Sequence, residues 1–191
     1  MLGTGRFNLD RASRMAGWFK ELAGEHTPET EEFGISSFIV RLPEPLHPQR
    51  FAAFLEKPLP GILRAKGYVW LASRPDWAIS YSRCGNTAAV EPVGRWWAAV
   101  PKERWPTEGS EERRLIEQSW RMPYGDRTNE VVFIGRFKDR VQNLKVIEQV
   151  FAECQLEPTE VRKGIDYWRE IPDQFPQWTP LTASEEEPEY T

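Results

Sequence analysis

The sequence predicts an α+β domain: a mainly antiparallel sheet of roughly four or five strands, helices on one face, and an N-terminal linker helix. The first observation is a hairpin pattern over residues 62–82, where two alternating stretches flank the turn-forming segment 73–76. The second is a pair of further β-branched, apolar runs at 35–42 and 129–137. The third is helical spacing of apolar residues before, between and after these runs.

The first strand of the hairpin predicts two unlike faces, because successive side chains of a strand alternate across the sheet. One face is aliphatic and requires a cover of helices. The other face is basic and aromatic, which suits either solvent or a partner. The aliphatic set is Leu63, Ala65, Gly67, Val69 and Leu71, and the basic and aromatic set is Arg64, Lys66, Tyr68 and Trp70.

Two helices and one strand are predicted before the hairpin. A helix runs from about residue 8 or 10 to residue 23, with Gly24 placed to end it. An acidic connection over 25–34 leads to the strand at 35–42, after which Pro48 occupies a favoured first helical position. The apolar sets are Ala12, Met15, Ala16, Phe19 and Leu22 in the first helix, Phe38, Val40 and Leu42 in the strand, and Phe51, Phe54 and Leu55 in the second helix.

The chain after the hairpin alternates again between strand and helix signals. A turn at 84–86 precedes a strand at 88–93, the run 96–100 is too short to assign, and a surface helix is expected at 111–120. After the strand at 129–137 a helix begins at Asp139, with a capping box to Gln142 and the buried stripe Val141, Leu144, Ile147 and Phe151. A last helix is expected at 157–170, and the end rich in proline and glutamate is expected to fray.

These elements predict three parts of the chain. Residues 1–34 form a linker helix and strap, residues 35–154 form the main domain, and residues 155–191 form a C-terminal helix with an acidic, partly disordered tail. The 191 residues carry a net charge of −4, so no overall basic field favours non-specific nucleic-acid binding. Two isolated cysteines, no recognisable signal peptide and no apolar run of about 20 residues predict a cytoplasmic chain away from membranes.

Few residues suggest a catalytic or metal-binding site. Gly3-Thr4-Gly5 lacks the lysine and hydroxyl of a phosphate loop, so hydrolysis of a nucleoside triphosphate is not expected. His26 lies among several glutamates and could in principle hold a metal, although a solvated acidic strap is the favoured interpretation. His47 is expected to cap or pack at a helix start. Cys84, at a turn, is a second candidate for zinc, and a structural thiol is the favoured interpretation of both Cys84 and Cys154.

Aromatic and basic residues leave a binding role open. Arg64, Lys66, Tyr68 and Trp70 are similar in type to the base-stacking surface of RNA-binding folds, but the glycine and aromatic consensus of such folds is absent. Nucleic acid is therefore disfavoured as a partner, and a stand-alone nucleic-acid or small-ligand module remains the alternative. Trp96 and Trp97 are either anchors of an interface or buried core residues.

Four ordered motifs carry a family resemblance. They are RAKGYVWLASRPD at 64–76, GRWWAAVP at 94–101, YGDR at 124–127 with EVVFIG at 130–135, and HP at 47–48 with RF at 50–51. Together they resemble the C-terminal domain of CobW-type P-loop GTPases over about residues 35–151. The segment LGTGRF at 2–7 and the helix after it resemble the lead out of the GTPase domain of that family, a domain that this chain lacks.

The resemblance implies a non-catalytic interaction or regulatory domain of a GTP-dependent metallochaperone, in zinc homeostasis or in cobalamin-related metal insertion. The partner would be the GTPase domain or a client metalloprotein. GTP, Mg and Zn or Co are implied for full-length members, with no catalytic, cofactor or metal residue in this chain. Partner contacts are expected at Arg64, Lys66, Tyr68, Trp70, Trp96 and Trp97.

Overall fold

A five-stranded antiparallel sheet organises the computed structural model, which describes residues 34–137 and 140–178. The strand order is β1-β5-β2-β3-β4. This confirms the predicted α+β class, whereas the predicted linker helix and Asp139 of the predicted capping box lie outside the described residues. The strands are β1 (Ile35–Leu42), β2 (Ile62–Val69), β3 (Trp77–Cys84), β4 (Thr87–Arg95) and β5 (Asn129–Arg136).

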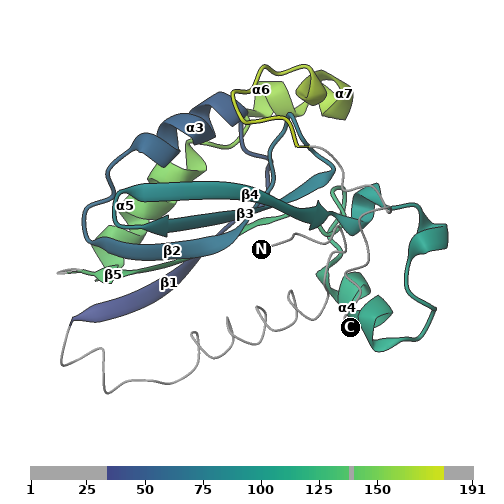
Figure 1. Ribbon diagram of the computed structural model, residues 1–191, viewed down its shortest axis with the longest axis horizontal. Coiled ribbons are helices and arrows are strands. Elements are labelled where there is room, and N and C mark those ends of the chain that lie inside the picture. Colours follow the sequence, from purple (N-terminus) through teal and green to yellow (C-terminus); the bar gives the residue numbers. More distant parts are fainter. Residues whose placement is uncertain (1–33, 138–139, 179–191) are drawn as a thin grey trace, which may run out of the picture.

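Two helices, α3 (Pro48–Glu56) and α5 (Arg140–Ala152), cover one face of the sheet (Figure 1). The ring of Phe51 in α3 lies 5.9 Å from that of Tyr81 in β3, and the ring of Phe151 in α5 lies 6.1 Å from that of Phe133 in β5. These four rings are fully buried, and burial of each large apolar side chain contributes about 2–3 kcal/mol. The main hydrophobic core therefore lies between the helices and the sheet.

Both ends of α3 are closed by side chains. Nδ1 of His47 accepts a hydrogen bond from the backbone N–H of Gln49 at 3.3 Å, and Pro48 occupies the first turn, as the sequence predicted. At the other end Nη2 of buried Arg83 donates to the carbonyl oxygens of Phe54 and Leu55, at 3.2 and 2.7 Å. A cation is favourable there because the carbonyl end of a helix carries partial negative charge.

Strand β5 comes last in the sequence but lies between β1 and β2, so the chain must travel around one end of the sheet to reach it. It does so through residues 96–128, here called the excursion, which project beyond the sheet (Figure 1). Close packing of β5 against β2 also explains Gly67, because a Cβ atom at that position would overlap the carbonyl oxygen of Glu130. The excursion holds the short 3-10 helices η1 (Trp97–Ala99) and η2 (Lys102–Arg104) and the helix α4 (Glu111–Ser119).

The spacing of apolar residues predicted that Leu63 and Val141 would be buried, and both are exposed. Leu63 is 47% exposed, because an irregularity between Ile62 and Arg64 shifts the register of β2 and turns Ile62 into the core instead. Val141 is 63% exposed at the start of α5, and the buried stripe of that helix is carried further along, by Ile147 and Phe151. Alternation and helical spacing predicted the elements, but both patterns failed near element ends.

The C-terminal part of the described chain also differs from prediction. In place of one helix over 157–170 there are two short helices, α6 (Pro158–Val161) and α7 (Gly164–Arg169), and Gly164 between them has a φ of +81°. Residues 171–178 do not fray, since the ring of Phe175 lies 6.2 Å from that of Phe51. The chain after α7 therefore returns to the main core.

Candidate interaction surface

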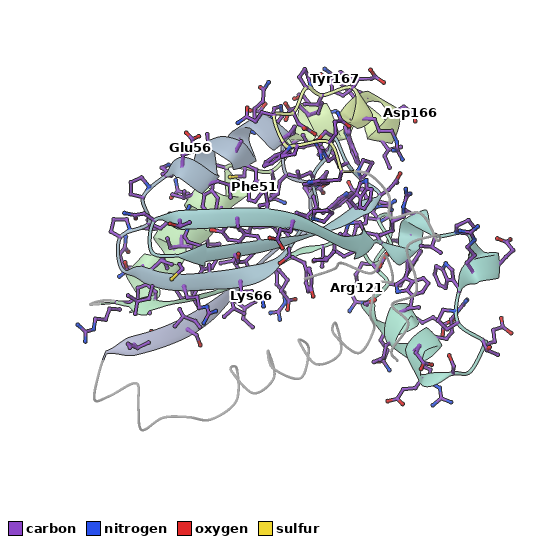
Figure 2. The ribbon with its side chains drawn as sticks, viewed as in Figure 1. Phe51, Glu56, Lys66, Arg121, Asp166 and Tyr167 are labelled. Carbon is purple, nitrogen blue, oxygen red and sulfur yellow. The ribbon has the colours of Figure 1, made fainter. Side chains whose placement is uncertain are left out.

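The face of the sheet turned away from α3 and α5, here called the outer face, carries the basic residues predicted from alternation. In the strand register Arg64 lies between Ile134 and Cys84, and Lys66 lies between Val132 and Ser82. Figure 2 shows Lys66 on the opposite side of the sheet from Phe51. The alternation of the hairpin strand therefore correctly predicted which face these two side chains occupy.

Arg64 is exposed on the outer face, while Lys66 and Tyr68 are half-buried. Tyr68 lies beside Glu130, whose carboxylate forms an ion pair with Arg41 of the edge strand at 2.7 Å. The outer face thus offers cationic groups around a tyrosine ring, a combination suited to an acidic partner surface. Their role in partner binding stays a prediction.

Trp70 does not belong to the outer face, which corrects the expectation that it would be exposed. Strand β2 ends at Val69, so the alternation no longer applies, and Trp70 is 0% exposed. Its backbone N–H donates to the side-chain oxygen of buried Asn129 at 2.8 Å, and its ring lies 4.8 Å from Tyr124 and 6.2 Å from Trp168. A ring enclosed in this way cannot stack on a base or anchor a partner.

The two predicted anchors Trp96 and Trp97 differ in burial. Trp96 is 6% exposed and belongs to a second hydrophobic cluster, together with Trp70 and Trp168. Trp97 is half-buried at the start of the excursion, where its ring lies 6.0 Å from that of Trp105. Burial removes Trp96 from any surface, and Trp97 remains a candidate for partner contact.

Loops from distant parts of the sequence meet around this second cluster, at a place here called the loop junction (residues 70–76, 96–98, 124–127 and 168–173). The guanidinium of Arg127 donates to the carbonyl oxygen of Pro75 at 2.7 Å and lies 5.9 Å from the Trp70 ring centroid. Asp76 accepts from Arg169 at 2.9 Å and lies 3.9 Å from Arg127. The junction therefore joins the β2–β3 connection to the excursion and to α7.

Asp126 holds the excursion at its base. Its two carboxylate oxygens accept the backbone N–H groups of Trp97 and Ala98 at 2.8 and 2.9 Å. Burial raises the pKa of Asp126, and the hydrogen bonds from Ala98 and Trp97 only partly oppose that effect. The aspartate of the YGDR motif therefore acts as a structural acceptor in this position.

Arg74 connects the loop junction to the C-terminal segment. Its Nε and Nη2 donate to the two carboxylate oxygens of Asp173 at 2.8 and 2.6 Å, and it also reaches the carbonyl oxygens of Phe175 and Pro176. The guanidinium lies 4.1 Å from the ring centroid of Trp178. Burial acts to raise the pKa of Asp173, but the hydrogen bonds from Arg74 and Ser73 outweigh it and lower that pKa.

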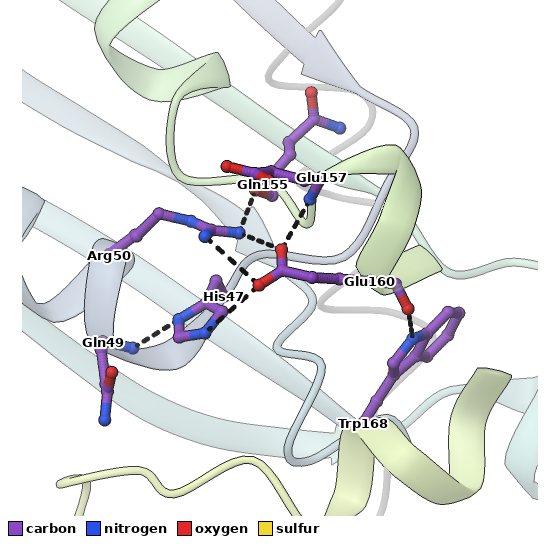
Figure 3. A network of polar contacts seen from close by, with 7 residues as sticks. All are labelled: His47, Gln49, Arg50, Gln155, Glu157, Glu160 and Trp168. Carbon is purple, nitrogen blue, oxygen red and sulfur yellow. Dashed lines mark hydrogen bonds and ion pairs between the residues drawn. The ribbon is translucent and has the colours of Figure 1, made fainter. Parts of the chain in front are cut away.

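A third polar network links α3 to α6 (Figure 3). Arg50 donates to Glu160 Oε2 at 2.6 Å and to the carbonyl oxygen of Gln155 at 2.7 Å, and His47 Nε2 lies 3.8 Å from Glu160. Burial and the nearby Arg50 lower the pKa of His47. Burial acts to raise the pKa of Glu160, but hydrogen bonds from Arg50 and from the Glu157 backbone lower it overall.

Residues 34–137 and 140–178 include two of the predicted metal and thiol candidates, Cys84 and Cys154. They contain no group of three or more histidine, cysteine or acidic side chains that could hold a metal ion. Cys154 is buried, and burial raises its pKa to about 12, as expected of an inert thiol, whereas Cys84 is exposed. His26 lies outside the described residues. No helix in the described part of the chain is long and apolar enough to cross a membrane.

Sequence reasoning missed several of the residues that build the loop junction. It named the tryptophans but assigned no partner to Asp126, Arg127 or Asp173. For Asp126 and Arg127 a signal existed, since both belong to the YGDR motif that carried the resemblance. Asp173 lies in a stretch with no motif, and only the fold brings it to Arg74.

A helix-backed antiparallel sheet joined to a loop junction defines an α+β domain, and the comparisons place it in a family. Residues 35–155 match the family model described as the cobalamin synthesis protein cobW C-terminal domain. The chain belongs to this family. This confirms the resemblance inferred from the four motifs, whose residues supply the β2–β3 connection, the excursion and the start of α3.

Relatives with printed roles are similar to this chain over part of their own length. "Zinc-regulated GTPase metalloprotein activator 1" of Dictyostelium discoideum is 36% identical over 172 residues, which cover 88% of this chain and 35% of that protein. "Zinc chaperone Rv0106" of Mycobacterium tuberculosis is 34% identical over 96 residues, covering 50% of this chain and 24% of that protein. The chain thus spans about a third of the first relative's length.

A solved structure also matches. The crystal structure of Zn(II)-bound YjiA GTPase from E. coli aligns with a TM-score of 0.42 and 17% sequence identity, over 70% of this chain and 33% of that chain. The family assignment depends on the match of residues 35–155 to the family model.

Proposed function

We propose that this chain is a non-catalytic interaction domain of a CobW-type, GTP-dependent metallochaperone, and that zinc is the metal handled by the system. The match of residues 35–155 to the cobW C-terminal domain carries the proposal. The printed names of two relatives, a zinc-regulated GTPase metalloprotein activator and a zinc chaperone, favour zinc over cobalt. The 191 residues contain no phosphate-loop motif, which supports a role in contact rather than in hydrolysis.

The outer face is the surface that we assign to the partner, either a GTPase domain or a client metalloprotein. Arg64 is exposed there, and Lys66 and Tyr68 are half-buried beside it. Trp70 and Trp96 are excluded because their rings are enclosed. Cationic groups on a face of the sheet raise the association rate with an acidic surface and orient that surface, and reversal of their charge weakens such a contact.

The test is binding to the GTPase domain of the Dictyostelium relative, produced separately and loaded with GTP or GDP. We expect the chain to bind it, and the double variant Arg64→Glu, Lys66→Glu to weaken binding by about tenfold or more. The matched control is Lys102→Glu, which reverses an exposed charge in η2 on the excursion. An equal loss of binding in Lys102→Glu would contradict the assigned surface. The proposal would also be contradicted if the chain bound neither the GTPase domain in either nucleotide state nor candidate apo-metalloenzymes.

A nucleotide titration separates this role from an enzymatic one. With GTP and Mg²⁺ added to the purified chain, we expect no binding tighter than about micromolar, because no lysine and hydroxyl pair is present to hold the β- and γ-phosphates. Turnover of GTP by the chain alone would overturn the proposal. Zinc affinity in the double variant His26→Ala, Cys84→Ala is the parallel test of direct metal binding, and we expect it to equal that of the parent chain.

A further inference from the structure

The outer face has an apolar strip beside its basic residues. Val132 of β5 pairs in register with Ile39 of β1, and Ile134 lies two residues along the same strand. These side chains point away from the buried helix-facing set of Phe133 and Val131. Val132 is 1% exposed and Ile39 and Ile134 are half-buried, although α3 and α5 lie on the opposite face. The apolar strip, as used below, is Ile35, Ile39, Val132 and Ile134.

An apolar strip on one face of a sheet requires a cover. Ile39 and Ile134 still keep part of their side chains in water, so a complementary apolar segment that covers them is favoured by the hydrophobic effect. A helix is a suitable cover, since its apolar stripe matches the width of such a strip. The question is which segment supplies that helix.

We propose that the N-terminal segment of this same chain docks on the apolar strip, through a helix over about residues 8–23. The sequence places Ala12, Met15, Ala16, Phe19 and Leu22 on one side of that predicted helix. The docked helix would lie beside Lys66 and Tyr68 and so border the surface assigned to the partner. The docking goes beyond the proposed function and does not require it.

Chain connectivity favours this occupant. The segment leads directly into Ile35, the first residue of β1, and β1 is the edge strand that itself contributes Ile35 and Ile39 to the strip. From Leu22 to Ile35 an extended chain could span about 40 Å, whereas neighbouring strands lie only about 5 Å apart. A predicted helix of about 14 residues would be about 21 Å long, enough to cover the strip.

Charge complementarity favours it as well. The connection between the predicted helix and β1 is acidic, with Glu25, Glu29, Glu31 and Glu32. The outer face next to the strip is basic, with Arg64 and Lys66 on β2. An acidic connection that crosses or borders this face is held by opposite charge, whereas a basic connection would be repelled.

A second copy of the chain is the main competing occupant, and effective concentration argues against it. A segment tethered by a short flexible connection samples its own docking site at a concentration of the order of millimolar. A second molecule at micromolar concentration would compete at a disadvantage of about a thousandfold for the same contacts. The strip is therefore expected to be occupied within one molecule.

Methyl NMR of the full chain tests the docking. We expect Phe19→Ser to shift the methyl resonances of Ile39, Val132 and Ile134, while those of Ile147 in the helix-facing core stay in place and report an intact fold. The matched control is Arg14→Ser, on the opposite side of the predicted helix, which should leave all four residues unchanged. Tenfold dilution of the parent chain should also change nothing.

Two outcomes would overturn the proposal. If Phe19→Ser leaves the strip resonances unchanged, the N-terminal segment does not contact them. If the strip resonances move on dilution of the parent chain, the occupant is a second copy. Neither outcome affects the charge-reversal test of the proposed function, because that test measures binding of a separate GTPase domain and not the methyl resonances of the strip, so the two ideas can fail separately.

Discussion

The helix-backed core and the loop junction are stabilised in different ways. The core is held by aliphatic and phenyl packing, as between Phe151 and Phe133, and its composition could vary as long as shape and polarity are kept. The junction is held by directed hydrogen bonds from charged side chains to loops far apart in sequence, as from Arg127 to Pro75. Several residues of the motifs that carry the family resemblance therefore hold loops together in this chain. Their presence in a motif is weak evidence that they contact a partner.

The variant with the largest expected effect is Phe151→Ala, which tests how much packing stabilises the helix-backed core. It removes a fully buried ring that contacts Phe51, Phe54 and Phe133, so we expect a loss of about 3–5 kcal/mol in the free energy of unfolding. Val141→Ala, in the same helix but 63% exposed, should cost less than about 1 kcal/mol. Urea denaturation of both variants measures the difference, and equal costs would contradict the assigned burial.

Arg74→Ala should have the next largest effect on the free energy of unfolding, and the structural change should be confined to the C-terminal segment. The ion pair with Asp173 is mostly shielded from solvent, so its loss leaves a poorly solvated carboxylate, at a cost of about 1.5–3 kcal/mol. Residues 171–178 should then become susceptible to limited proteolysis while the sheet persists. Arg114→Ala, at an exposed position of α4, is the control and should change neither property. A segment that resists protease in Arg74→Ala would show that Phe175 and Trp178 hold it without the arginine.

Asp126→Ala should cost about 1–3 kcal/mol, because the backbone N–H groups of Trp97 and Ala98 lose their acceptor. Asp126→Asn keeps one acceptor oxygen and should lose less. Urea denaturation gives the cost, and amide hydrogen exchange at the two residues locates it. Protection that is unchanged in Asp126→Ala would mean that another group holds the excursion.

The smallest expected effect is a pH dependence at the start of α3. The pKa of His47 is lowered in the folded chain, so the unfolded chain takes up the proton first as pH falls below about 6.5, and stability should decrease by less than about 1 kcal/mol. His47→Asn keeps a capping acceptor but cannot titrate, so its stability should vary less between about pH 5 and 7.5. Glu160, whose pKa is lowered, stays ionised throughout this window. Unfolding midpoints across the window make the comparison, and equal slopes would contradict it.

Sequence patterns that lie within one helix or strand correctly predicted many of its buried residues. Alternation placed Phe38 and Val40 of β1 in the core, and the proline and aromatic spacing of α3 predicted its start and its buried side. Such patterns predict burial because the direction of the side chains repeats about every 3.6 residues in a helix and every two residues in a strand. The face that each residue occupies therefore follows from its position in the element. At Leu63 and Trp70 that repetition is broken, by an irregular register and by the end of a strand, and the prediction failed there.

By itself the sequence determined the class of fold, the order of the main elements, the basic side of the hairpin strand and the family, because each depends on local periodicity or on motifs in fixed order. Only the tertiary structure decided that Trp70 and Trp96 are enclosed, that Asp126 holds the base of the excursion, and that Arg74 meets Asp173. These last contacts join residues about 30 to 100 positions apart, and pairings at such separation arise from how the loops close in space, which no local pattern encodes.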